Sequence, residues 1–196
     1  MKDQPTPKNE HDKEEELQKP KFNLKEEIIS WIQILVTAAL IAFVLNRFII
    51  ANSRVPSASM ENTIMTHDRV IGSRLSYHFS DPERGDIVIF YFPDDVTEKT
   101  YYVKRIIGLP GDIIDIKDGH VFLNGSEEPL EEPYLKDDME TPEELHFEVP
   151  EDCYFMMGDN RNFSSDARFW DNTYVKREKI VAKVLFRYFP SIGKIE

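Results

Sequence analysis

The hydrophobic pattern divides the chain into three stretches. Residues 1–23 carry hardly an apolar side chain, residues 28–45 form one uninterrupted apolar run, and beyond them short apolar segments alternate with polar turns. The run has no formal charge and would extend about 27 Å as a helix. Because a bilayer core is about 30 Å thick, the run together with residues 48–50 is long enough to cross it. We therefore predict one transmembrane helix over residues 28–50.

A cleaved secretory signal and a buried core helix are the alternatives to a membrane anchor. The apolar region of a signal is about 7–15 residues long and its leader is short and basic. Here the leader is 27 residues long, with six Lys against eight Asp and Glu. A core helix would carry a polar face, which this run lacks. The pattern therefore favours a retained anchor.

The charges that flank the predicted helix indicate its orientation. Three lysines precede the apolar run 28–45 and two arginines closely follow it: Lys19, Lys21, Lys25, Arg47 and Arg54. Positive residues gather on the cytoplasmic side of a membrane helix. We therefore predict a disordered cytoplasmic tail over residues 1–27 and an extracytoplasmic domain over residues 51–196.

The predicted domain reads as a series of strands. Residues 86–92 and 101–107 are apolar segments that end at proline or glycine. Six further candidate strands are Arg69 to Ser73, Ile113 to Ile116, Val121 to Leu123, Leu145 to Val149, Tyr154 to Met157 and Ile180 to Tyr188. Many short strands at close spacing predict a mainly β domain, an antiparallel barrel or sandwich. The acidic stretch Glu127 to Glu144, with three prolines, is predicted to be a solvated excursion from it.

Composition narrows the function of this domain. Residues 51–196 carry 17 Lys and Arg against 28 Asp and Glu, a net charge of −11, which argues against a nucleic-acid partner. Cys153 is the only cysteine, so the chain has no intramolecular disulfide. Its apolar surroundings predict a packed thiol rather than a nucleophile. The sequence offers no cluster of metal ligands.

Two short segments, residues 56–60 and 102–106, offer a serine nucleophile and a lysine base. Serine needs a neighbouring base to accept its proton, and that base is usually histidine. The five histidines stand in polar or turn-like settings without a partner motif, and we interpret them as surface residues: His11, His67, His78, His120 and His146.

Lysine can replace histidine as the base only when it is neutral. An exposed lysine is neutral in about one part in 10³ at pH 7, and burial in an apolar site increases that fraction by disfavouring the charged form. Strand alternation puts Tyr102, Lys104 and Ile106 on one face, so Lys104 has an aromatic and an aliphatic neighbour. The alternative is an exposed lysine on a strand edge, where its charge prevents the edge from pairing with another chain.

Taken alone, the serine segment is an ordinary turn and residues 158–168 could be a hydrogen-bonded turn network. In this order after an anchor, however, four segments resemble one family, the bacterial type I signal peptidases, over about residues 28–190. The segments are Ser57-Ala58-Ser59-Met60, Arg84-Gly85-Asp86-Ile87-Val88, Tyr102 through Asp112, and Gly158-Asp159-Asn160-Arg161 through Ser164, Asp166 and Arg168.

The resemblance assigns roles by position. It implies that Ser59 is the nucleophile and Lys104 its general base. Ser57 and the backbone N–H of Ser59 correspond to the donors of the oxyanion hole. Ser164 corresponds to a serine that orients the lysine, and Met60 to a side chain that packs beside the site.

By the same resemblance, Asp159 pairs with Arg105 and Asp166 with Arg168, so that these residues hold the loop rather than touch substrate. The sequence departs from the common family pattern at three places, none of which removes a catalytic atom: Ala58, Glu61-Asn62-Thr63 and Ala167.

The family resemblance also implies a fold, a reaction and partners. The fold is a mostly antiparallel β-structure, barrel-like, with a catalytic core similar to that of LexA-type self-cleaving repressors. The reaction is acyl transfer without metal or organic cofactor, on preproteins that carry small residues at the first and third positions before the cut. We expect a monomer that is bound to membrane lipid and has no nucleic-acid partner.

Three alternative functions remain. The first is a catalytically silent, membrane-tethered β-domain that binds peptides or envelope partners, although such a domain has no chemical reason to keep Ser59, Lys104 and Ser164 together. The second is another Ser/Lys processing protease, such as a pilin or conjugation peptidase. The third is a LexA-like self-cleaving regulator, which the anchor and the lack of a basic DNA-binding segment disfavour.

Overall fold

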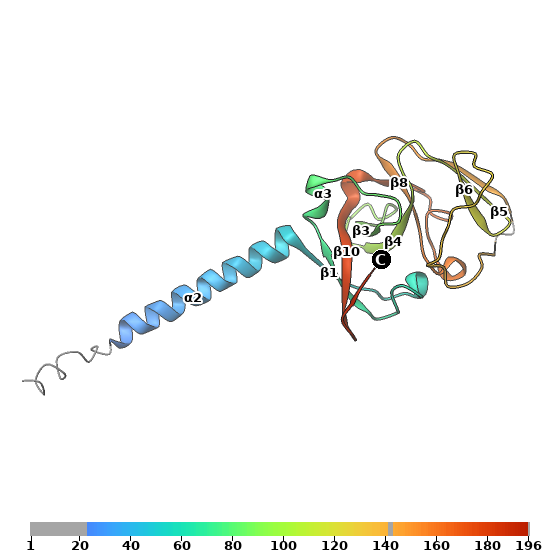
Figure 1. Cartoon of the computed structure of the whole chain (residues 1–196). Coiled ribbons are helices and arrows are strands. Elements are labelled where there is room, and N and C mark those ends of the chain that lie inside the picture. Colours follow the sequence, from blue (N-terminus) through green and yellow to red (C-terminus); the bar gives the residue numbers. More distant parts are fainter. Residues whose placement is uncertain (1–22, 141–142, 196) are drawn as a thin grey trace, which may run out of the picture. The chain divides into compact units, whose positions relative to one another are not determined.

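An apolar helix precedes a domain built from β-strands. The computed structural model describes residues 23–140 and 143–195 (Figure 1). The chain divides into two compact units, residues 1–43 and 44–196. Helix α2 (Leu24–Val44) is followed by five π-helical residues, Leu45–Ile49. Among the described residues this 26-residue stretch is the one helix long and apolar enough to cross a membrane, and its most apolar 18 residues have a mean hydropathy of 2.5.

Helix α2 begins at Leu24 rather than at Ile28 because Asn23 caps it. The Asn23 side-chain oxygen accepts a hydrogen bond from the Lys25 N–H at 3.3 Å. Two glutamates in the first turn stabilise the helix, because their negative charges lie at the positive end of its dipole. Residues 1–22 of the predicted tail lie outside the described residues. At the other end, Ile50 starts the first strand instead of ending the helix.

Eight strands form the main sheet of the second unit, and every pairing in it is antiparallel. Its order is β1-β2-β10-β3-β4-β8-β9, with β11 paired to β10. The strands are β1 (Ile50–Arg54), β2 (Arg69–Ser73), β3 (Ile87–Tyr91), β4 (Tyr101–Gly108), β8 (Cys153–Met157), β9 (Val175–Lys176), β10 (Ile180–Phe189) and β11 (Gly193–Lys194). A short helix, α3 (Ser76–Phe79), follows β2. The path is open, with β1 and β9 at its ends, so the described strands do not form a closed barrel.

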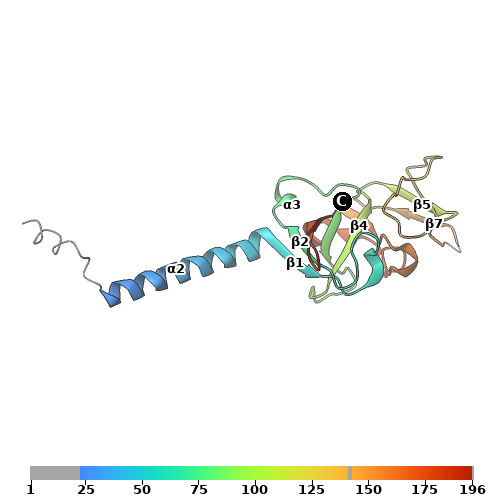
Figure 2. The same cartoon turned by 60° about the horizontal axis from the view of Figure 1, so that its bottom comes forward.

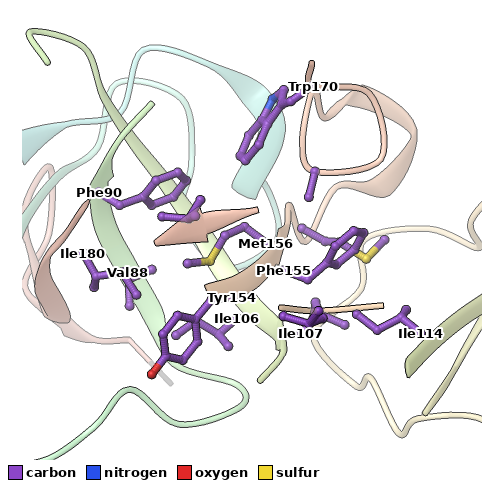
Figure 3. Close-up of a cluster of buried hydrophobic side chains, with 14 of the residues drawn as sticks. Val88, Phe90, Ile106, Ile107, Ile114, Tyr154, Phe155, Met156, Trp170 and Ile180 are labelled. Carbon is purple, nitrogen blue, oxygen red and sulfur yellow. The ribbon is translucent and has the colours of Figure 1, made fainter. Parts of the chain in front are cut away.

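A second antiparallel sheet has three strands in the order β6-β5-β7. They are β5 (Ile113–Lys117), β6 (His120–Leu123) and β7 (Leu145–Glu148). Figure 1 labels β5 and β6, and Figure 2 labels β5 and β7. Its apolar residues join the same core as the main sheet, and Figure 3 shows Ile107 of β4, Ile114 of β5 and Phe155 of β8 gathered there. Gly108 allows this contact, because a Cβ at that position would overlap Ile114.

The central strands of the main sheet are buried on both faces. Along β3, Val88 and Phe90 belong to one apolar cluster, whereas Ile87 and Ile89 belong to the other. Alternate side chains of a strand point to opposite faces, so an unbroken apolar run marks a strand covered on both sides. These two clusters pack on the two faces of the sheet and hold its strands in fixed positions.

The eight predicted strands are confirmed, each to within one residue at either end. Strands β1, β9 and β11 were not predicted, because β9 and β11 have two residues each and the start of β1 was assigned to the helix. The prediction of a solvated acidic excursion is wrong where the stretch packs against the rest of the domain. The Met139 residue is 4% exposed and the Glu132 side chain 5%, because both pack against the 158–168 loop.

Candidate active site

Ser59 lies in a short turn that the core holds in place. The chain leaves β1 through Val55 and enters a 3₁₀ turn, Ala58–Met60. Met60 and Val55 are buried in one apolar cluster, which fixes the turn at both ends. The Ser59 residue is only 4% exposed, and its Oγ lies 3.2 Å from the Oγ of Ser57. Ser59 is therefore a buried hydroxyl on a rigid turn, with a second hydroxyl beside it.

Lys104 reaches this turn from the middle of β4. It stands opposite Val88 in the antiparallel ladder, and its ammonium nitrogen donates a hydrogen bond to the Oγ of Ser59 at 2.5 Å. The residue is 4% exposed, and its Nζ lies 5.6 Å from the centre of the Tyr102 ring on the same strand face. The structure therefore brings together a serine and a lysine that are 45 residues apart in the chain.

Burial lowers the pKa of Lys104 to about 8, because the apolar surroundings disfavour the charged form. The carboxylates of Asp166 and Asp159 oppose this shift, and Arg168 adds to it. With a pKa of about 8, roughly one lysine in ten is neutral at pH 7, against roughly one in a few thousand when exposed. The site thus holds a lysine that can accept a proton near neutral pH.

The 158–168 loop lies against both of these residues. Asn160 ties it to the serine turn, because its backbone N–H donates to the carbonyl oxygen of Ser59 at 3.1 Å and its side-chain Nδ2 to that of Ala58 at 3.0 Å. Asp159 forms a buried bidentate ion pair with Arg105 at 2.8 and 2.9 Å. The loop is therefore fastened both to the turn and to β4.

A second buried ion pair closes the other end of the loop. Asp166 accepts hydrogen bonds from Nε and Nη2 of Arg168, at 2.8 and 2.9 Å, and from the backbone N–H of Gly158 at 3.1 Å. Both side chains are almost fully buried. Since one carboxylate holds both the start and the end of the loop, the loop keeps one shape.

Ser164 lies beside the dyad without bonding to it. Its hydroxyl is buried, and among the described residues it has no hydrogen-bond partner. The Cα of Gly158 faces this hydroxyl and the carbonyl oxygen of Ser59 so closely that a Cβ there would overlap both. The structure therefore places Ser164 against the serine turn, whereas Lys104 donates its hydrogen bond to Ser59.

A cleft of about 360 Å³ opens over the two residues. It is lined by Ser53, Arg54, Val55, Pro56, Ser57, Ser59, Thr100, Tyr101, Tyr102, Val103, Lys104, Phe163 and Ser165. Two strand edges border it. In the described residues β1 is paired on one side only, and β4 pairs with β8 only from Arg105 onward. Free strand edges on both sides suit an extended peptide, which can add backbone hydrogen bonds to them.

The pairing of two buried residues near the site, Arg161 and Glu132, was not predicted from the sequence. They form a bidentate ion pair that joins the loop to the acidic stretch. Arg161 stands in the recognised segment, but nothing in the sequence distinguishes Glu132 from the many acidic residues around it. Their contact joins residues 29 positions apart, so only the tertiary structure pairs them.

The described histidines and Cys153 do not line the cleft. The four described histidines are exposed: His67, His78, His120 and His146. Cys153 is half-buried at the start of β8, and burial raises the pKa of its thiol, so it is a poor nucleophile. Within residues 23–140 and 143–195 there is no group of three or more side chains suited to hold a metal ion.

Comparison with known proteins identifies the family of the chain. The family model described as signal peptidase, peptidase S26, matches residues 28–189. A probable signal peptidase I-2 of Synechocystis sp. is 36% identical over 170 residues, which cover 82% of this chain and 74% of that protein. Signal peptidase I P of Bacillus subtilis subsp. natto is 33% identical over 178 residues, 86% of this chain and 92% of that one.

A crystal structure of a signal peptidase I from Enterococcus faecalis is also similar, with 28% identity and a TM-score of 0.44 over 53% of this chain and 97% of that chain. The family model covers most of the sequence, and both relatives align along more than two thirds of their own length. The chain belongs to the signal peptidase family, peptidase S26, and is a hydrolase of that family.

Proposed function

We propose that this protein is a membrane-anchored serine endopeptidase that removes signal peptides from exported preproteins, with Ser59 as nucleophile and Lys104 as general base. One observation carries the proposal. The Nζ of Lys104 lies 2.5 Å from the Oγ of Ser59, and burial lowers the pKa of that lysine to about 8. A hydroxyl and a largely desolvated amine in contact are the parts that a serine–lysine hydrolase needs.

The reaction proceeds in two halves. Neutral Lys104 takes the proton of the Ser59 hydroxyl while Oγ attacks the scissile carbonyl carbon. The lysine ammonium then gives that proton to the leaving amine, the C–N bond breaks, and an ester joins the signal peptide to Ser59. In the second half Lys104 takes a proton from water as the water oxygen attacks the ester carbonyl carbon. The lysine ammonium then gives that proton to Oγ of Ser59, the ester C–O bond breaks, and the signal peptide leaves as a carboxylic acid.

The negative oxygen of each tetrahedral intermediate needs hydrogen-bond donors. The Ser57 hydroxyl, 3.2 Å from the Ser59 Oγ, and the backbone N–H of Ser59 are the donors we assign. One such donor typically stabilises the transition state by about 3–4 kcal/mol. The rigid turn that carries both groups supports the assignment, because preorganised donors need no rearrangement during the reaction.

The substrate binds as an extended strand along the cleft. Strands β1 and β4 offer it free backbone groups on either side, and Val55, Tyr102 and Phe163 are among the residues that line the cleft. Membership of the signal peptidase family supports cleavage after small residues of the Ala-X-Ala type.

Helix α2 and the residues that follow it anchor the enzyme. They are apolar and long enough to cross a bilayer, and the flanking charges favour a cytoplasmic N-terminus with residues 51–196 outside the cytoplasm. The anchor confines enzyme and membrane-bound precursor to one surface and so raises their effective concentration. The enzyme acts as a monomer, because one chain supplies both the serine and the lysine.

Cleavage of a preprotein with an Ala-X-Ala site tests the proposal. The full chain, solubilised in detergent, is compared with Ser59→Ala and Lys104→Ala, and the new N-terminus of the product is sequenced. We expect the unmodified protein alone to cut after the second Ala. If a known signal peptidase cuts the same substrate and this protein leaves it intact, the proposal is wrong and a tethered peptide-binding domain takes its place.

A further inference from the structure

Part of the predicted acidic excursion binds the turn that carries the nucleophile. We call residues 132–140, between β6 and β7, the clamp segment. The side-chain Nδ2 of Asn62 donates hydrogen bonds to the carbonyl oxygens of Tyr134 and Leu135, at 3.1 and 3.2 Å. Lys136 forms an ion pair with Glu61 at 2.9 Å. The clamp segment therefore holds the residues that directly follow the serine turn.

The same segment binds the 158–168 loop. The backbone N–H of Lys136 donates to the carbonyl oxygen of Asp159 at 3.3 Å. The side chain of Asn162 accepts from the N–H of Glu140 and donates to the carbonyl oxygen of Asp138, both at 2.9 Å. The clamp segment thus touches both pieces of chain that surround the dyad.

Its deepest contact is the ion pair between Glu132 and Arg161. The Arg161 side chain is fully buried and that of Glu132 is 5% exposed. Nη1 of Arg161 donates to one carboxylate oxygen at 2.9 Å, and Nη2 donates to the other. The hydroxyl of Tyr134 adds a hydrogen bond to the same carboxylate at 2.7 Å. A buried cation needs such a partner, since it cannot be solvated where it lies.

Arg161 in turn connects to both ends of the loop. Its Nε donates to the carbonyl oxygen of Gly158 at 3.1 Å, and its own carbonyl oxygen accepts from Nη2 of Arg168 at 2.7 Å. Gly158 is pressed against the backbone of Ser59, and the loop residues Phe163 and Ser165 line the cleft together with Lys104.

We propose that Glu132 is a positioning residue, whose carboxylate holds the 158–168 loop closed beside Lys104 by way of Arg161. The inference rests on the proposed function, because it concerns the same dyad. Without the carboxylate, Arg161 is left buried and unpaired, and the loop moves to let water reach it. Water also reaches Lys104, and its pKa rises from about 8 toward the ordinary value because burial is the main cause of the lowering.

Three substitutions separate this role from a merely structural one. Glu132→Gln keeps the shape of the side chain but removes its charge, whereas Glu132→Asp keeps the charge. Glu131→Gln makes the same charge change at an exposed neighbour and serves as the control. For each full-length, detergent-solubilised variant, the melting temperature and the pH profile of kcat/KM are measured on an Ala-X-Ala preprotein.

A second readout needs no cleavage. In a Ser59→Ala background, the pH dependence of Lys104 acetylation by acetic anhydride, followed by mass spectrometry, reports the pKa of the lysine directly. For Glu132→Gln we expect the midpoints of the kcat/KM profile and of the acetylation profile to move up by about one pH unit. As a result, kcat/KM at pH 7 falls about tenfold. Glu132→Asp moves the midpoints less, and Glu131→Gln leaves them unchanged.

The proposal is overturned if Glu132→Gln lowers the melting temperature or the amplitude of the profile but leaves both midpoints in place. A destabilised enzyme contains less active protein, yet its remaining sites titrate normally. If the unmodified protein fails to cleave while the acetylation midpoint still moves in Glu132→Gln, the proposed function fails and the positioning role stands.

Discussion

The Cα of Gly158 faces the carbonyl oxygen of Ser59 with no room for a side chain between them. The contact joins the 158–168 loop to the serine turn at the point where Asn160 also bonds to it. Only glycine allows the two backbones to approach so closely. A substitution at this position therefore tests whether the activity depends on the placement of the serine turn against the loop.

Gly158→Ala should nearly abolish cleavage. The added Cβ must push the loop or the serine turn aside, and a displacement of about 1 Å in a reacting group costs about 100-fold in rate. Stability should fall by about 1–3 kcal/mol, as for other overpacked sites. The control is Gly193→Ala, where a Cβ meets only the end of the Arg187 side chain at 3.5 Å. Equal kcat/KM for the two variants would contradict this account.

The activity should depend on pH through Lys104. The base acts in its neutral form, and its pKa is about 8, so kcat/KM should rise about tenfold per pH unit below pH 8 and level off above it. A profile on preprotein cleavage between pH 6 and pH 10 measures this midpoint. A midpoint near 6.5, typical of histidine, would show that Lys104 is not the base.

Lys104→Met should make an inactive but more stable protein at neutral pH. The folded state holds this lysine at a pKa of about 8, below the ordinary 10.5 of the unfolded chain, so burying the charged form costs about 3 kcal/mol below pH 8. The cost shrinks as pH rises from 8 to 10.5 and vanishes above it, because the lysine is then neutral in both states.

Urea unfolding of the unmodified protein and Lys104→Met at pH 7 and pH 10 checks the sign. The gain in the free energy of unfolding should be larger at pH 7 than at pH 10. Lys99→Met, at an exposed lysine, should show no such difference. A Lys104→Met protein that is less stable at pH 7 would mean that burying the charged lysine does not destabilise the folded state.

Asp159→Asn should destabilise the domain strongly. It removes the carboxylate charge that faces the buried guanidinium of Arg105, and breaking such a pair costs about 3–5 kcal/mol. Lys179→Ala removes a more exposed ion pair with Glu98 and should cost at most about 1 kcal/mol. Chemical denaturation of both variants measures the contrast, and similar losses would argue against a special role for the buried pair.

The strand pattern was predictable because apolar runs such as residues 87–91 must be buried and are cut off by glycine and proline. Strand β1 was harder to predict. Its first residue, Ile50, continues the apolar sequence of the helix, and its pairing with Ser73 of β2 decides its conformation. A non-local hydrogen-bond ladder leaves no local signal in a stretch as short as Ile50–Arg54.

The sequence by itself determined the apolar helix, eight of the eleven described strands and the segments that mark the family, because each of these depends on residues close together in the chain. The tertiary structure decided the pKa of Lys104 and the pairing of the buried charges around it. Lys104 becomes a base only where distant strands exclude water from it, and Glu132 differs from its acidic neighbours only through its contact with Arg161. Burial and pairing depend on segments that are remote in sequence, so no local pattern carries them.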